Sequence, residues 1–126
     1  MKVIILLKRR PDISHEEFRH HYETVHSELA HKYVGHLLVE YRRNYPQLIE
    51  GSDQETDAPD MLHSPYDAIT ELRYPDRAAY EESRRIMSDP VIGKIFEEDE
   101  ENFMDRAAFR IFTCEEVTSP EASLRR

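Results

Sequence analysis

The start of the chain constrains the fold, because it is an unbroken apolar run of strand length. Val3-Ile4-Ile5-Leu6-Leu7 lies between Lys2 and Lys8. Consecutive apolar side chains over so short a segment are typical of a strand in the interior of a sheet. The sequence therefore predicts a sheet with this segment inside it.

A helix is predicted directly after this strand, from about His15 to Tyr33. Pro11-Asp12 turns the chain, and Ser14 is a good N-cap. Glu17, three residues later, completes a capping box. Gly35 marks the end of the helix.

The remaining elements follow from alternation and from helix-start signals. Strands are expected over 36–45, 66–74 and 107–117. A helix capped by Asp76 follows Pro75, and another begins at Ser88-Asp89-Pro90, with Ser88 or Asp89 as its cap. The order of strands and helices is that of a split β-α-β, ferredoxin-like fold.

The expected fold class is α+β, an antiparallel four-stranded sheet with helices on one face. The other face of the sheet also carries apolar and aromatic residues, and an isolated protomer would leave it wet. Two such sheets packed face to face would form a homodimer, a dimeric α+β barrel.

One domain is expected over residues 1–117, with residues 118–126 as a loose C-terminal tail. Residues 47–65 are polar and acidic, and they predict an inserted loop. A loop of this length in a compact domain is usually a lid, a binding loop or disordered.

The net charge of the chain disfavours some classes of binding partner. The net charge is −9, which disfavours a nucleic-acid backbone or an anionic membrane. Cys114 is the single cysteine, so an internal disulfide is excluded and a reducing compartment is favoured. No apolar run reaches transmembrane length, and the N-terminal run is too short for a signal-peptide core. The expectation is a soluble cytoplasmic protein.

His26 is the leading candidate for chemistry. With Phe18 at zero, a helical rotation of about 100° per residue puts Leu29 at about 20°, Tyr22 at about 40° and His26 at about 80°. An ionisable imidazole therefore borders the buried stripe beside a phenol, where it could act as an acid or base. From position alone, a structural histidine that satisfies a backbone carbonyl is the more common case.

Asp99 is the second candidate. With Ile92 at zero, Phe96 falls at about 40°, Asp99 at about −20° and Phe103 at about 20°, so the carboxylate is central on an apolar stripe. A buried carboxylate needs a partner. Asp99 is expected to act as a cap or to pair with an arginine, or else to orient a site residue.

Other tyrosines and arginines are candidates for substrate contacts. Phenolic hydroxyls can stabilise an oxyanion, although aromatic residues at these spacings are more often part of the core. Tyr22, one turn before His26, is the best of them for the site. The candidate phenols are Tyr22, Tyr41 and Tyr45, and the candidate carboxylate-binding groups are Arg42, Arg43 and Arg73, for which surface ion pairing is the default.

The spacing of the histidines does not favour a metal site. His15, His20, His21, His26, His31 and His36 recur mainly at a spacing of five. Five residues rotate by about 140° in an α-helix, which scatters the rings, and the i, i+4 pair of helical metal sites is missing. No metal is expected, and the histidines other than His26 are expected at the surface.

The chain resembles the EthD family of dimeric α+β barrel proteins. The resemblance rests on residues 7–18 with Lys8-Arg9-Arg10-Pro11 and Phe18, on Tyr22-Glu23-Thr24-Val25-His26, on residues 64–72, and on Asp99-Glu100-Glu101-Asn102-Phe103-Met104-Asp105. It covers the chain from Lys2 to about Glu116. The segment 47–65 departs from the family, so the resemblance does not carry over a substrate.

The resemblance implies a cofactor-free lyase or isomerase that acts on a small aromatic, polyketide-like or lactone-type molecule. His26 would move a proton, with Tyr22 and Asp99 at the same site. Tyr41, Tyr45, Asp67 and Arg43 would contact the substrate, and Asp67 could equally cap a helix or pair with an arginine. Two alternatives are a non-catalytic dimeric binding or accessory protein and a cofactor-independent monooxygenase.

Overall fold

The structure, a computed structural model, describes residues 1–47 and 65–125. In these residues four strands form one antiparallel sheet in the order β2-β3-β1-β4. The strands are β1 (Lys2–Leu7), β2 (Glu40–Asn44), β3 (Ala68–Arg73) and β4 (Arg110–Cys114). The α-helices are α1 (His15–His21), α2 (Ser27–Val34), α3 (Arg77–Met87) and α4 (Pro90–Phe103).

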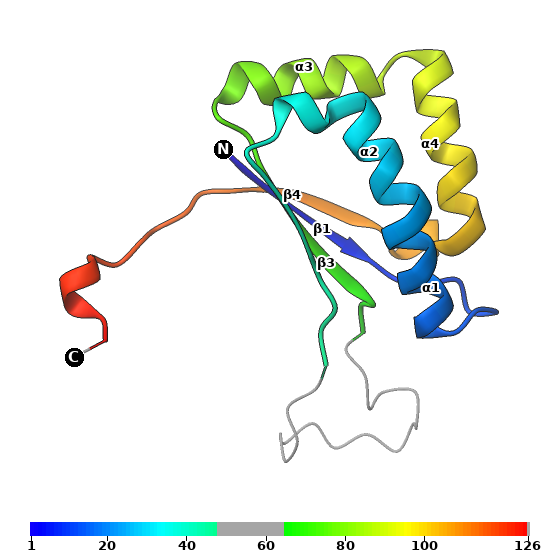
Figure 1. The fold of residues 1–126 in the computed structure, drawn as a ribbon, viewed down its shortest axis with the longest axis horizontal. Coiled ribbons are helices and arrows are strands. Elements are labelled where there is room, and N and C mark those ends of the chain that lie inside the picture. Colours follow the sequence, from blue (N-terminus) through cyan, green and yellow to red (C-terminus); the bar gives the residue numbers. More distant parts are fainter. Residues whose placement is uncertain (48–64, 126) are drawn as a thin grey trace.

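The expected α+β class is confirmed, and β1 is an interior strand with β3 and β4 as its neighbours. All four helices lie on one side of the sheet (Figure 1). Val3 and Leu7 on β1 and Ala68 and Thr70 on β3 point to the helices and are buried. Among the described residues, no helix covers the other face.

The helix starts follow the local sequence. The Ser14 hydroxyl accepts from the Glu17 N–H, and the Glu17 side chain accepts from the Ser14 N–H, so the predicted capping box is present. Asp76 caps α3 through the Ala79 N–H. Asp89 caps α4, with Pro90 in its first turn.

The strands are shorter than their patterns predicted. The second strand was expected from residue 36, but Gly35–Leu37 forms a 3-10 turn and β2 begins at Glu40. The turn is closed by a hydrogen bond from the Leu38 N–H to the Gly35 carbonyl. These residues turn the chain at the end of α2 before it enters the sheet. The alternating pattern of side chains therefore predicted a strand that starts too early.

The first long helix contains a feature that the sequence analysis did not predict. Between α1 and α2, residues Tyr22–His26 form one π-helical turn. The Ser27 N–H donates to the Tyr22 carbonyl, five residues back. In an α-helix this bond would reach only four residues back, so the π-turn adds one residue to the helical repeat.

The core between helices and sheet has two parts. One is built on Phe18, Tyr22 and Phe103 and reaches the sheet at Leu7 and Ala68. Phe18 and Phe103 are fully buried, with ring centroids 5.3 Å apart. The other part joins α2 to α4 through three buried residues, Ala30, Val34 and Phe96.

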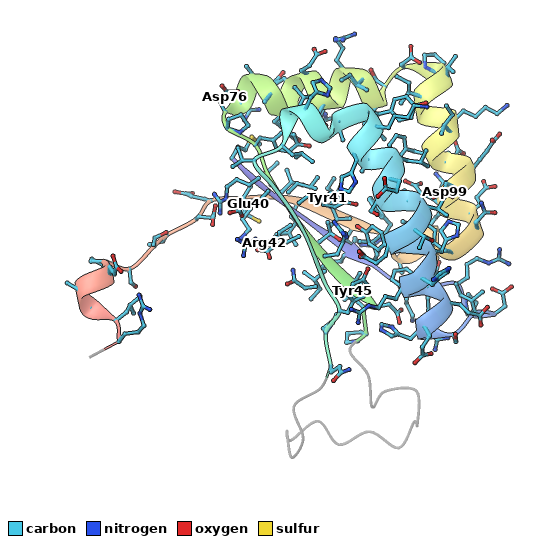
Figure 2. The ribbon with its side chains drawn as sticks, in the orientation of Figure 1. Glu40, Tyr41, Arg42, Tyr45, Asp76 and Asp99 are labelled. Carbon is cyan, nitrogen blue, oxygen red and sulfur yellow. The ribbon has the colours of Figure 1, made fainter. Side chains whose placement is uncertain are left out.

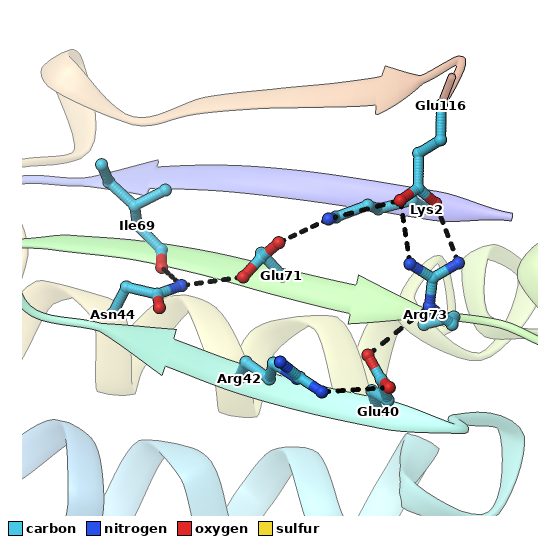
Figure 3. A network of polar contacts seen from close by, with 8 residues as sticks. All are labelled: Lys2, Glu40, Arg42, Asn44, Ile69, Glu71, Arg73 and Glu116. Atoms are coloured by element: carbon cyan, nitrogen blue, oxygen red, sulfur yellow. Dashed lines mark hydrogen bonds and ion pairs between the residues drawn. The ribbon is translucent and has the colours of Figure 1, made fainter. Parts of the chain in front are cut away.

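The open face of the sheet is partly apolar and partly charged. Ile4 pairs with Phe112, and Leu6 pairs with Ile69. Beside them a network of ion pairs and hydrogen bonds joins β1, β2 and β3 to Glu116, two residues after the end of β4 (Figure 3). Its members are Lys2, Glu40, Arg42, Asn44, Glu71, Arg73 and Glu116.

The prediction of a loop over 47–65 falls almost entirely on residues 48–64, which lie outside the described residues. The tail from Thr118 to Arg125 leaves the sheet and is exposed throughout, with a short 3-10 turn at Glu121–Ser123 (Figure 1). Among the described helices, none is both long and apolar enough to cross a membrane.

Candidate functional site

A cavity of about 550 Å³ lies between the sheet and the helices. Its floor is β1, with Val3, Ile5 and Leu7. Most of the wall is apolar, and a few polar side chains reach it from several elements. Those polar residues are Tyr22, His26, Tyr41, Tyr74, Tyr80, Ser83, Arg84, Glu100 and Thr113. A cavity of this size and character suits a small, mostly apolar molecule.

His26 lies in the wall of this cavity, at the end of the π-turn, and its side chain is 11 % exposed. Its Nδ1 lies 2.9 Å from Oδ2 of Asp99 on α4. An ionised carboxylate can only accept, so Nδ1 carries the proton and Nε2 keeps a lone pair. Nε2 has no hydrogen-bond partner among the described residues, in which every buried side-chain nitrogen and oxygen is paired. Nε2 is therefore open to the cavity or to water.

Asp99 accepts from a second imidazole. His21 Nε2 lies 2.8 Å from the other carboxylate oxygen, and the ring of His21 stacks on Phe103 at 4.7 Å. Figure 2 shows Asp99 on α4 beside the first long helix. The alternative of an arginine or a cap as the partner of Asp99 is wrong, because both carboxylate oxygens bind histidines.

The expectation that all other histidines lie at the surface is therefore wrong for His21. The rotation of 140° between residues five apart holds for an α-helix, but His21 and His26 flank a π-turn. In a π-turn, residues five apart come close to one full turn. The spacing of five is the signal that could have found His21, had the π-turn been considered.

Burial lowers the pKa of His26 below its ordinary value of 6.5, and Asp99 opposes this shift without reversing it. The nearby His21 adds a smaller lowering. His26 is therefore neutral near pH 7, which is the form that can accept a proton.

Two phenols, Tyr22 and Tyr41, line the same cavity as His26. The Tyr22 hydroxyl lies 2.6 Å from Oγ1 of Thr70. The Tyr41 hydroxyl donates to the Tyr22 hydroxyl over 3.5 Å. The ring centroids of Tyr22 and His26 are 5.6 Å apart. Burial raises the pKa of both tyrosines, so both keep their protons and can donate.

Tyr45 and Arg43, two other candidates, are held outside the cavity wall. Both bind Glu23: Arg43 Nε donates to Oε2 at 2.8 Å and Nη2 to Oε1 at 2.7 Å, and the Tyr45 hydroxyl makes a short hydrogen bond. These contacts, with Arg43 first, lower the pKa of Glu23 to about 2. Arg43 is thus occupied by a carboxylate of the protein itself.

Asp67, the remaining candidate, ties the loop after β1 to β3. It accepts from the Arg9 N–H at 2.8 Å and from His15 Nδ1 at 3.0 Å, and Arg9 Nε lies 3.5 Å away. Asp67 does not line the cavity. The structure thus brings Tyr22, His26 and Tyr41 to the cavity with Asp99 behind His26, and leaves Tyr45, Asp67 and Arg43 apart from it.

In the described part of the chain, no group of three or more histidine, cysteine or acidic side chains is arranged to hold a metal ion. A second hollow of about 650 Å³ lies around the start of α4. Most of its side chains are charged, and it does not include His26. The cavity that includes His26 is therefore the candidate functional site.

Comparison with known proteins agrees with this fold. A crystal structure of an EthD (ethyl tert-butyl ether D) family protein from Bacillus halodurans superposes with a TM-score of 0.58 at 21 % identity, covering 93 % of this chain and 99 % of that one. An Arabidopsis thaliana protein gives a TM-score of 0.59 at 14 % identity, with 94 % and 97 % covered. HapK from Hahella chejuensis gives 0.53 at 12 %, with 95 % and 98 % covered. No curated protein matched the sequence.

The sheet order, the one-sided helices and these neighbours define a ferredoxin-like α+β protein. The family model of the EthD domain matches residues 10–107. The chain belongs to the EthD family, as its sequence motifs indicated.

Proposed function

We propose that the protein is a cofactor-free lyase or isomerase that moves a proton on a small, largely apolar carbonyl compound. The observation that carries the proposal is the pairing of His26 with Asp99 at the wall of the cavity. The carboxylate fixes the imidazole tautomer, and the free Nε2 is the base.

The reaction follows from the placement of these groups. His26 Nε2 would take a proton from a carbon next to a carbonyl, and the electron pair of that C–H bond would form an enolate. The hydroxyl of Tyr41 or Tyr22 would donate to the enolate oxygen. The imidazolium would then return the proton to another carbon, giving an isomer, or to a departing hydroxide, giving water and an alkene.

Asp99 would act through His26 and not on the substrate. Its charge stabilises the imidazolium that forms during proton transfer. His21 would hold the same carboxylate from its other oxygen, which keeps Asp99 aimed at His26. His21 thus joins the site as a positioning residue.

The test is an exchange reaction that needs no knowledge of the natural substrate. The purified protein is mixed with 2-tetralone in D₂O, and loss of the α-proton signals is followed by proton NMR. We expect exchange faster than the buffer rate, and no acceleration with His26→Asn. His20→Asn is the matched control, because His20 is an exposed neighbour on α1. Equal exchange by the wild type and His26→Asn would remove His26 from the mechanism.

The alternative of a non-catalytic binding protein rests on the same cavity. It is favoured if 2-tetralone binds with no accelerated exchange and His26→Asn binds equally well. An apolar cavity is enough for capture, whereas catalysis also needs the oriented base.

We also propose that the protein is a cytoplasmic homodimer formed through the open face of the sheet. Ile4, Leu6, Ile69 and Phe112 supply an apolar patch, and Phe112 is 49 % exposed. The ion-pair network beside the patch contains both signs of charge, so a second copy related by a two-fold axis can meet it with opposite charges. The free Cys114 and the net charge of −9 support a reducing compartment and a partner other than nucleic acid.

A further inference from the structure

Arg84 differs from its neighbours on α3 in having no carboxylate partner in the described part of the chain. Arg77 pairs with Glu81 at 3.1 Å, and Arg85 Nε donates to Glu82 at 2.8 Å. No carboxylate among the described residues lies within 4.0 Å of the Arg84 guanidinium. Its side chain makes one hydrogen bond, from Nη1 to the Tyr80 hydroxyl at 3.3 Å.

Arg84 is also the single lysine or arginine among the described residues that line the cavity. The guanidinium lies 5.9 Å from the centre of the Tyr80 ring, and the neighbouring Ser83 is hydrogen-bonded to Tyr74 at 3.0 Å. Tyr80, Ser83 and Tyr74 also line the cavity. The Arg84 guanidinium therefore lies at the part of the cavity formed by α3, close to three hydroxyl groups.

The cavity therefore joins two different chemical environments. α3 crosses the end of α2 that is farther from α1, whereas His26 lies at the start of α2 (Figure 1). α2 has eight residues, so these two places are about 12 Å apart along its axis. The wall between them is apolar, with Ala30 and Val34 from α2.

The acidic residue of the cavity does not neutralise Arg84. Glu100 has a cation of its own, because Arg106 Nε lies 3.4 Å from Oε2. Glu81, the carboxylate whose charge acts on Arg84, is paired with Arg77. With respect to the described residues, the Arg84 guanidinium is unpaired with any carboxylate and can bind an anion from outside the protein.

We infer that the substrate of the cavity is an apolar molecule with a carboxylate at one end, held by Arg84, and a carbonyl at the other, facing His26. This inference rests on the proposed function for the carbonyl end, but its anionic end rests on Arg84 alone. It replaces the expectation that Arg42, Arg43 or Arg73 would hold a substrate carboxylate. Arg42 and Arg73 lie on the open face of the sheet, and Arg43 is bound to Glu23.

The test compares an acid with its neutral amide of the same shape. The probes are 6-oxo-6-phenylhexanoate and 6-oxo-6-phenylhexanamide, which share a phenyl ketone and an apolar tether. Binding is measured by isothermal titration calorimetry with the full chain. We expect the acid to bind about five- to tenfold more tightly than the amide, the size of one charge-assisted contact to an exposed arginine.

Variants of α3 assign the preference to one side chain. Arg84→Gln should reduce the preference for the acid to less than about twofold, mainly by weakening acid binding, whereas Arg84→Lys should keep part of the preference. Arg85→Gln is the matched control, since Arg85 is adjacent and does not line the cavity. Both positions are exposed, so these variants should fold normally.

Three outcomes would overturn the inference: equal binding of acid and amide by the wild type, a preference that survives Arg84→Gln, or no binding of either probe. The first two leave the proposed function standing, because 2-tetralone exchange does not depend on Arg84. If both probes fail to bind and exchange is also absent, the proposed function fails as well.

Discussion

His26 and Asp99 are joined by a hydrogen bond of 2.9 Å between residues that are 73 positions apart in the chain. The bond connects the end of the π-turn to the middle of α4, and Phe96 and Phe103 flank it with ring centroids 5.7 and 5.0 Å from that of His26. These aromatic neighbours bury most of the pair, so the charge of Asp99 acts on the imidazole with reduced screening.

Replacement of Asp99 by asparagine should lower the pKa of His26 further. The carboxylate raises this pKa through its hydrogen bond and its charge, and an amide lacks the charge. The measurement is a titration of the His26 ring nitrogens by NMR in wild type and Asp99→Asn. We expect 2-tetralone exchange to fall by about 10- to 100-fold as the imidazolium loses its counter-charge. An unchanged pKa would contradict the assignment of Asp99 as its partner.

Replacement of His21 by glutamine should shift the same pKa in the opposite direction. The positive form of His21 disfavours a second positive charge on His26, and glutamine removes this repulsion. Glutamine can still donate to Asp99, so the carboxylate keeps its orientation. The NMR titration should show a higher His26 pKa in His21→Gln and a lower one in Asp99→Asn. A shift in the same direction for both would show that the two variants act by general loosening of the site.

The rate of 2-tetralone exchange should rise with pH, because only neutral His26 can accept the proton. Since the pKa of His26 lies below 6.5, the rate should already have reached its plateau at pH 6.5.

The stability of the fold should also depend on the pKa of His26. In the unfolded chain His26 has its ordinary pKa, so on acidification the unfolded state takes up this proton first and the folded state loses stability below pH 6.5. Urea unfolding at a series of pH values measures the effect, and His26→Gln should remove this step.

A second loss of stability should follow at lower pH from Glu23. Its pKa is lowered from 4.5 to about 2 by Arg43 and Tyr45, so its contribution is complete above 4.5 and is lost as the pH falls towards 2. Glu23→Gln should remove the second step and keep the first. If this variant unfolds with the same pH profile as the wild type, the contact with Arg43 does not contribute to stability.

Replacement of Thr70 by valine should destabilise the fold by about 1–3 kcal/mol, because it leaves the buried Tyr22 hydroxyl with only its long contact to Tyr41. Removing both partners of the 2.6 Å bond, as Tyr22→Phe with Thr70→Val, should cost less than the sum of the single changes. Chemical denaturation of the three variants measures the coupling. Strictly additive costs would show that the two hydroxyls do not interact.

The dimer proposal predicts that Phe112→Asp gives a monomer by analytical ultracentrifugation. Phe112 is half exposed in a single chain, so the change should have little effect on folding. Val91→Asp is the control, since Val91 is 69 % exposed at the start of α4, on the helix side of the protein. A dimer that persists in Phe112→Asp would place the interface elsewhere.

Much of the fold could be predicted from local patterns. The apolar run at the start of the chain gave an interior strand, and Ser14, Asp76 and Asp89 cap their helices as expected, because these signals act within a few residues. Strand ends were less predictable. Whether residue 36 continues a turn or starts a strand depends on where the sheet lies, and the local sequence does not contain that information.

The site was predictable in part for a similar reason. Tyr22 and Tyr41 could be placed because a regular helix or strand has a known period, whereas His26 lies at the end of a π-turn, where the α-helical period no longer holds. Asp99 could be recognised as needing a partner, but its actual partners lie 73 and 78 residues away. Arg43 could not be excluded from substrate binding by sequence, since its neutralisation by Glu23 depends on how β2 lies against the first long helix.

The π-turn changes the rotation of the first long helix, so the residues before it and after it face the core with different periodic positions. Upstream of Tyr22, the side of the helix that faces the core is fixed by the packing of Phe18 on Phe103. Downstream of His26, it is fixed by the packing of Ala30 and Val34 near Phe96. One extra residue in the repeat lets each half keep its own apolar side on the core. Deleting a single residue between Tyr22 and His26 would rotate the downstream half by about 100° relative to the upstream half. His26, the proposed base, would then turn with its helix, so the length of this segment matters as much as its composition.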